Sequence, residues 1–133
     1  PTESEMKKKK QMYEDSLHST RAALEEGTLP GGGVALLQAA KSIDLSHLSP
    51  DEKVGGDILR KACEMPFRQI VLNTGFDASV VLEEVLSRKS KTIGFNAATE
   101  TIEDLLTAGI IDPAKVVKSS LRHAVSMAGV VLL

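Results

Sequence analysis

Aromatic side chains are scarce in this chain. It has no tryptophan, one tyrosine and three phenylalanines, which together make up 3% of its 133 residues. A hydrophobic core must therefore be built mainly from aliphatic side chains. Proteins that bind single-stranded nucleic acid stack its bases on aromatic side chains, so this composition argues against that class.

The chain also lacks a large excess of charge of either sign, and it has a single cysteine. The formal net charge of −2 provides no general attraction to phosphate backbones or anionic membranes. The basic run Lys7-Lys8-Lys9-Lys10 lies among acidic residues, and we interpret it as a solvated helix face rather than a polyanion site. The single cysteine, Cys63, excludes an intrachain disulfide, and its apolar neighbours favour a small core residue over a nucleophile.

Several signatures of function are missing from the sequence. No apolar run is long enough to span a membrane and no signal peptide opens the chain, so we expect a soluble intracellular protein with no membrane partner. Neither a GxxxxGK[ST] loop nor a GxGxxG after a strand is present. His18, His47 and His123 lack the paired spacing of zinc ligands, so we expect no metal site.

Hydrophobic periodicity predicts a mainly α fold, a helical bundle of about five to seven helices with one or two very short strands. A long helix is expected over Glu3–Glu26, ended by Gly27, and a short one over Val34–Ile43, almost entirely apolar and therefore expected to be buried nearly all round. Ser49-Pro50-Asp51-Glu52 forms a capping box that begins the next helix. We expect its buried stripe to comprise Val54, Ile58, Ala62 and Met65, and Pro66 to end or kink it.

The second half of the chain alternates helices with short extended segments. Asp77 is predicted to cap a helix that buries Val81, Leu82, Val85 and Leu86, followed by a surface loop over residues 87–91. Short strands are expected at Thr92–Phe95 and Ile110–Ile111. Asp112-Pro113 is predicted to cap and begin a last helix with its buried stripe at Val117, Leu121, Ala124, Ala128 and Leu132.

Polar groups and glycines at the ends of these elements are the candidate ligand contacts. Gly31, Gly32 and Gly33 open a helix, which suits a ribose or an anion, although a flexible turn is an equal alternative for an isolated run. Asn96 follows a short strand, and we expect its amide to be free to read a base edge. Asp112 could cap the following helix or accept hydrogen bonds from the two hydroxyls of a ribose. Asp15 lies on the long helix near its apolar stripe, where it is either a ligand contact or a solvated surface carboxylate.

The order of these segments resembles the group I chaperonins, the GroEL family. The resemblance is carried by residues 14–23 and 25–27, by Pro30-Gly31-Gly32-Gly33-Val34-Ala35-Leu36-Leu37, by residues 66–73, by Gly94-Phe95-Asn96-Ala97-Ala98-Thr99-Glu100, and by residues 108–116. It covers essentially the whole chain. The chain departs from the family in its basic loop at residues 87–91 and in the loop at residues 44–49.

This resemblance implies a place in a larger ATP-driven machine. Residues 1–25 would be a helix of the intermediate domain, and residues 26–133 the carboxy-terminal part of the equatorial domain that binds ATP with Mg²⁺. Asp15 would act on the attacking water as the catalytic residue. The implied cofactor-binding residues are Gly31 and Gly32 at the ribose, Asn96, Ala97 and Ala98 around the adenine, Ile110 against the base, and Asp112 at the ribose hydroxyls.

The resemblance also implies partners and missing parts. The partners would be other subunits of a homo-oligomeric ring, a co-chaperonin and unfolded client proteins, in a bacterial cytoplasm or an organelle matrix. Nothing in the sequence matches the phosphate loop or the magnesium ligand, and Val130–Leu133 ends without a cap, so we expect an excised fragment. Alone it should bind ATP at millimolar affinity or worse and should not hydrolyse it. The alternative is a self-associating helical module without nucleotide chemistry.

Overall fold

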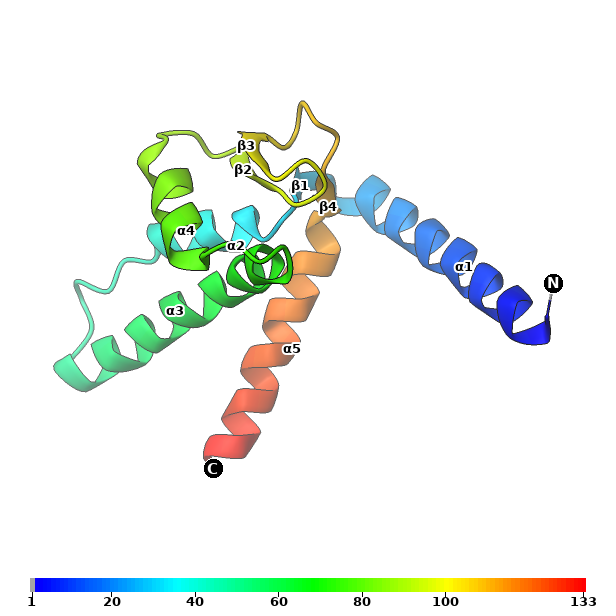
Figure 1. Cartoon of the computed structure of the whole chain (residues 1–133). Helices are drawn as coiled ribbons and strands as arrows, with labels where there is room; N and C mark the ends of the chain where they lie inside the picture. The colour runs from blue at the N-terminus through cyan, green and yellow to red at the C-terminus, as the bar shows by residue number, and fades with distance from the viewer. Residues whose placement is uncertain (1) are drawn as a thin grey trace. The chain divides into compact units, whose positions relative to one another are not determined.

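The computed structural model describes residues 2–133 and contains five helices and four short strands (Figure 1). In chain order the elements are α1 (Glu3–Glu26), β1 (Thr28–Pro30), α2 (Val34–Ser42), α3 (Pro50–Asn73), α4 (Ala78–Ser87), β2 (Ile93–Asn96), β3 (Thr101–Asp104), β4 (Ile111–Pro113) and α5 (Ala114–Leu132). The mainly α prediction is confirmed, with four short strands where one or two were expected. No helix within residues 2–133 is long and apolar enough to cross a membrane.

The chain divides into two units. We call the first the two-helix unit; it comprises the chain up to Leu29 together with Asp112–Leu133. The second is the core unit, Pro30–Ile111, which contains nearly all of the buried apolar side chains.

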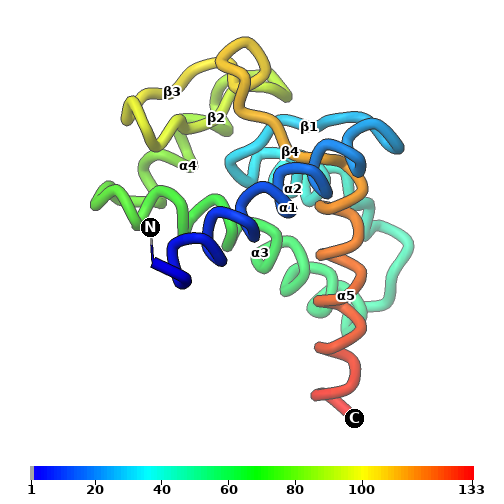
Figure 2. The backbone as a smooth tube through the Cα atoms, turned by 90° about the vertical axis from the view of Figure 1, so that its right-hand side faces the viewer, coloured from blue at the N-terminus to red at the C-terminus, as the bar shows by residue number. Residues whose placement is uncertain are grey.

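In the two-helix unit, α1 and α5 meet where α1 ends and α5 begins (Figures 1 and 2). A capping box between Thr2 and Glu5 begins α1, and Gly27, with φ of +80°, ends it as predicted. The amide of Ala114 then donates to the Gly27 carbonyl, 3.0 Å away, where β1 pairs with β4. Two ion pairs, Lys115 with Glu25 and Lys118 with Glu26, join the same ends of the two helices.

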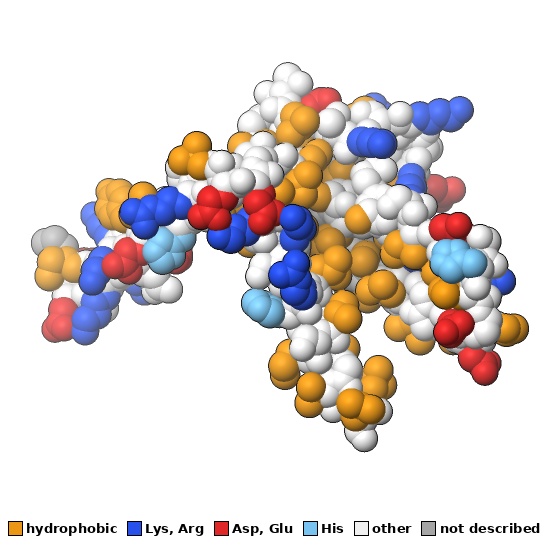
Figure 3. All heavy atoms as spheres, turned by 180° about the vertical axis from the view of Figure 1, so that it is seen from behind, with side chains coloured by type: hydrophobic (Ala, Val, Ile, Leu, Met, Phe, Trp, Pro, Cys, Tyr) orange, Lys and Arg blue, Asp and Glu red, His pale blue; other side chains and the backbone are white. Residues whose placement is uncertain are grey.

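The start of α5 differs from the prediction. Pro113 is the N-cap residue, no side chain caps the helix, and Asp112 stands one residue outside it. The expected buried stripe is also wrong beyond Leu121, because the rest of α5 is exposed (Figure 3). Periodicity correctly located an apolar face, but no described element covers it.

In the core unit, α2 packs on α3, α3 packs on α4, and the antiparallel β2–β3 hairpin completes the core. Asp77 caps α4, and the predicted inward side chains of this helix are buried or half-buried. The central cluster is formed by Val34, Leu37, Phe67, Val71, Ala78, Val81, Leu82, Val85, Phe95 and Leu105. Among the residues of α2, only Val34, Leu37 and Ala40 are buried, so this helix is covered on one face and not all round.

Helix α3 begins at the predicted capping box of Ser49 and Glu52 and continues through Pro66 to Asn73. The buried residues of α3 are Cys63, Phe67 and Val71, spaced four apart on one face. The predicted stripe is therefore wrong. Its members Val54 and Ile58 are 60% and 64% exposed, and Ala62 and Met65 are exposed as well. In this half of α3, Leu45 of the preceding loop lies over Gly56, and the Arg60 guanidinium donates to the Ile43 carbonyl.

Candidate functional site

The first two glycines of the run hold the start of α2 against two distant segments. The amide of Gly31 donates to the Ile110 carbonyl at 3.0 Å, and a Cβ on Gly31 would lie 3.1 Å from Cγ2 of Ile110. Gly32 has φ of +62°, and a Cβ there would meet Leu105 Cδ1 at 3.2 Å and the Phe95 carbonyl oxygen at 3.6 Å. These contacts place Gly31 and Gly32 beside Ile110 and the end of β2.

The third glycine brings α2 against α3. Gly33 is the N-cap residue of α2, with φ of +77°. A Cβ at this position would lie 2.7 Å from the backbone nitrogen of Phe67 and 2.9 Å from its Cα. Because the neighbour is helix backbone, no side-chain movement could relieve the overlap. The run is therefore a packed junction and not a flexible turn.

Asn96 ends β2, and its side chain is engaged within the hairpin. The residue is 8% exposed. Its Nδ2 donates to Glu103 Oε1 at 2.6 Å, and its Oδ1 accepts from the backbone nitrogen of Ala98 at 3.0 Å. The expectation of a free amide is thus wrong, since one donor and one acceptor are already used. Ala97 and Ala98 follow in an exposed turn.

Asp112 lies in β4, in the two-helix unit, and is half-buried. Burial raises the pKa of its carboxyl group, because the charged form loses solvation there. No hydrogen bond or ion pair joins its side chain to any other residue in the range 2–133, and it does not cap α5. A carboxylate that is partly desolvated and makes no internal bond is available to accept hydrogen bonds from a ligand.

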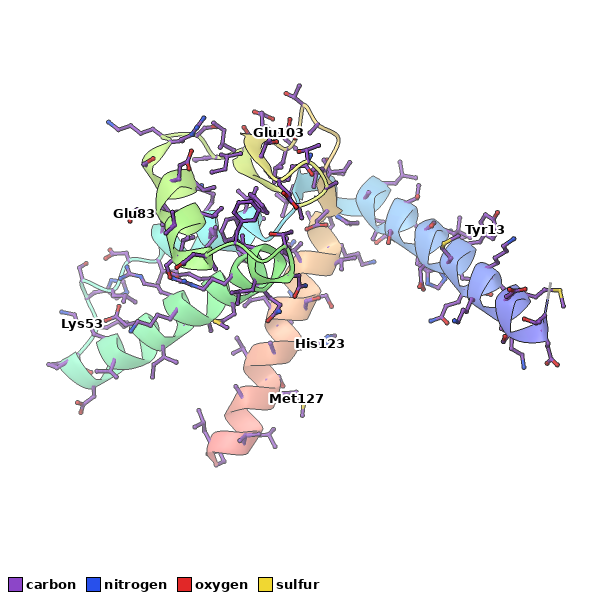
Figure 4. All side chains as sticks on the ribbon, viewed as in Figure 1. Tyr13, Lys53, Glu83, Glu103, His123 and Met127 are labelled. Atoms are coloured by element: carbon purple, nitrogen blue, oxygen red, sulfur yellow. The ribbon has the colours of Figure 1, made fainter. Side chains whose placement is uncertain are left out.

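Asp15 is exposed on α1 and lines a cleft of about 480 Å³ between α1 and α5. His18 lines it from the same helix, and Lys115, Ser119 and His123 line it from α5. Figure 4 shows His123 and Met127 on the same side of α5, one turn apart. The cleft is open to solvent, so a water molecule can reach the Asp15 carboxylate. Among residues 2–133, no three His, Cys, Asp or Glu side chains are placed to hold a metal ion.

Comparison with protein families matches residues 1–133 to the TCP-1/cpn60 chaperonin family. The chain belongs to this family. It is 61% identical over 132 residues to Chaperonin GroEL 3 of Protochlamydia amoebophila (strain UWE25), which covers 99% of this chain and 24% of that protein. Its structure resembles the crystal structure of a group III chaperonin in the open state, with a TM-score of 0.71 and 28% identity over 77% of this chain and 22% of that one. The resemblance to the GroEL family is confirmed, and the chaperonin chain spans about a quarter of the length of these relatives.

The structure brings part of the predicted site together. Within the core unit Gly31 contacts Ile110, and Gly32 lies against Phe95 of the strand that carries Asn96. Asp15 and Asp112 belong to the two-helix unit.

Sequence reasoning missed Glu103 of this chaperonin chain, the partner of the Asn96 amide. The signal that could have found it was a second strand pairing with the one predicted at residues 92–95. In that register Glu103 lies opposite Gly94, on the face that it shares with Asn96. The residues 101–104 were not predicted as a strand, so the pairing could not be drawn from the sequence.

Proposed function

We propose that this chain supplies part of the nucleotide site of an ATP-dependent chaperonin. Residues 1–25 belong to the intermediate domain in this proposal, and residues 26–133 form the carboxy-terminal part of the equatorial domain. The observation that carries it is the contact of Gly31 with Ile110 and of Gly32 with the end of β2. That contact occurs in a chain 61% identical to Chaperonin GroEL 3.

The individual roles follow from the chemistry of each position. Gly32 lets the backbone approach the ribose, and Asp112 accepts hydrogen bonds from its two hydroxyls, a role supported by its lack of an internal partner. Ile110 packs on the base. The adenine is bounded by Asn96 with the exposed Ala97 and Ala98, whose backbone groups lie in an open turn.

Asp15 is the proposed catalytic residue. Phosphoryl transfer to water needs a group that orients or deprotonates the attacking molecule in line with the γ-phosphate. The exposed carboxylate of Asp15 can do this, since it is not engaged in any ion pair among residues 2–133. Carried on a long helix, it would reach the nucleotide only in a suitable domain arrangement, which would couple hydrolysis to domain movement.

Other groups must complete the site. When bound, Mg²⁺ would neutralise charge on the β- and γ-phosphates, and no described residues form a cluster that could hold it. The polypeptide of residues 1–133 alone should therefore bind ATP at millimolar affinity or weaker, because the strongest charge contacts come from elsewhere. We also propose a homo-oligomeric ring with a co-chaperonin and unfolded clients, working in a bacterial cytoplasm or an organelle matrix.

The test is Asp15→Ala in a full-length chaperonin that contains this chain. ATP turnover should fall by about 10²-fold or more while ATP binding is retained, because the substituted group acts on water and not on the nucleotide. The matched control is Glu14→Gln, a neighbouring acid whose partner is Lys10 in an exposed ion pair. Unchanged turnover in Asp15→Ala would contradict the proposal. It would favour a helical module that associates through its exposed apolar faces on α3 and α5.

A further inference from the structure

Glu103 and Asn96 lie on the same face of the β2–β3 hairpin. Residues opposite each other in an antiparallel pair share a face, and Glu103 is paired with Gly94, two residues before Asn96. Gly94 has no side chain of its own to come between the carboxylate and the amide. A Cβ on Gly94 would lie 2.4 Å from Val34 Cγ2, so the core excludes a larger residue there.

The hydrogen bonds of Asn96 fix which way round its carboxamide lies. A carboxylate only accepts hydrogen bonds, so Glu103 requires the amide nitrogen to face it, and Nδ2 does so at 2.6 Å. The backbone nitrogen of Ala98 only donates, so it requires the amide oxygen, which lies 3.0 Å away. Turning the amide over would set two acceptors together at one end and two donors together at the other. Both partners therefore oppose the flipped amide.

After these two bonds, the carboxamide keeps one N–H and one oxygen lone pair for a ligand. Adenine presents an amino donor beside a ring-nitrogen acceptor, which an amide of defined orientation can match. Guanine presents an oxygen acceptor in place of the amino group and an N–H in place of the adjacent ring nitrogen. A carboxamide that could turn over would suit either base, whereas a fixed one suits only one of them.

We propose that Glu103 is a specificity-determining positioning residue, which holds the Asn96 carboxamide in the orientation that favours adenine over guanine. This inference rests on the proposed function, in which Asn96 borders the base. Glu103 itself does not touch the base; it acts through Asn96.

The experiment compares ATP and GTP binding by a full-length chaperonin that contains this chain, with and without Glu103→Gln. A glutamine amide at this position can donate or accept, so only the Ala98 backbone amide then opposes the flipped Asn96 carboxamide. The preference for ATP over GTP should fall about tenfold, mainly through tighter GTP binding. The control is Glu83→Gln, the same change at an exposed acid of α4 (Figure 4), which should leave the preference unchanged.

A second variant, Glu103→Asp, keeps the charge but shortens the arm by one methylene, so it should lower the preference by a smaller factor. Glu103→Asp replaces Glu103→Gln in the binding comparison if the glutamine variant yields little folded protein. If Glu103 merely braces the hairpin, its variants will weaken ATP and GTP binding equally; an unchanged ratio overturns the inference and leaves the proposed function standing. A parent protein that binds neither nucleotide overturns both.

Discussion

Lys118 Nζ lies 2.5 Å from Glu26 Oε2, so a cation near the start of α5 is paired with an anion at the end of α1. Lys115 and Glu25 form a second pair beside it. The C-terminal end of a helix disfavours anions, because its free carbonyl groups carry partial negative charge. The two lysines offset this unfavourable placement of Glu25 and Glu26, and the offset depends on α1 and α5 staying together.

These pairs define a pH window for the contact between α1 and α5. The hydrogen bond from Lys118 lowers the pKa of Glu26. The stabilisation that this pair gives to the helix contact is therefore present above the ordinary carboxyl range and is lost as pH falls through the lowered pKa. The hydrogen bond to Glu25 raises the pKa of Lys115. The stabilisation from this second pair is therefore lost only as pH rises through the raised pKa of the lysine. Both contributions are therefore present near neutral pH.

Reversing one charge should loosen α1 from α5. In Lys118→Glu, two carboxylates would face each other, and the distance between spin labels at Tyr13 and Met127, both exposed, should become more broadly distributed. The double variant Glu26→Lys with Lys118→Glu should restore the parent distribution. High salt should act like the single variant, since the pairs are exposed. Identical distributions in all of these would show that the ion pairs do not hold the helices.

Gly33→Ala should destabilise the core unit more than Gly75→Ala. Both glycines have positive φ, but a Cβ on Gly75 meets nothing within 4 Å, whereas one on Gly33 meets the backbone of Phe67. Backbone strain alone should cost about 1–2 kcal/mol in each. Overlap should add about 1–3 kcal/mol in Gly33→Ala. Native-state hydrogen exchange of the α2 and α3 amides measures this difference, and equal costs would contradict the close packing.

Two aspartates that precede helices should respond differently to alanine. Asp77 accepts from the amides of Ser79 and Val80, so Asp77→Ala should cost about 1 kcal/mol of stability. Asp112 makes no such bond, so Asp112→Ala should cost nothing or stabilise slightly at neutral pH.

The pH dependence gives Asp112 a second check. Burial raises its pKa, so the charged form opposes folding as pH rises through that range, and any gain from Asp112→Ala should disappear when the carboxyl is protonated. Melting temperatures of parent and variant at neutral and acidic pH measure this. A loss in Asp112→Ala as large as that in Asp77→Ala would show that Asp112 does cap a helix.

Local signals predicted most of the helices in this chain. Gly27 ends α1, and the capping box of Ser49 and Glu52 begins α3, because these features act through neighbouring backbone groups. Burial was harder to predict: the apolar face of α3 at Val54 and Ile58 is real, but periodicity does not say whether another element covers it. Length does not explain why β1 and β3 were missed, because β2 and β4 are equally short and strands were predicted at both places.

In the candidate site, too, features set by neighbouring residues were predicted and contacts between distant residues were not. The glycine run and the residues after the expected strands were found from the sequence, because glycines and polar groups at element ends are local features. The partner of Asn96 was not, since Glu103 reaches it only through the register of a hairpin. Asp112 precedes a proline, and only the backbone shows that the helix starts beyond both.

Pro66 has no amide hydrogen, so the carbonyl of Ala62, four residues earlier in α3, lacks its usual helical donor. That carbonyl is free to take up a water molecule, and the ladder of hydrogen bonds along the helix is interrupted at this step. The interruption separates the turns carrying Val54 and Ile58 from those anchored by Phe67 and Val71. Fraying from the solvent-facing end of α3 can therefore stop at the proline, leaving the anchored turns intact.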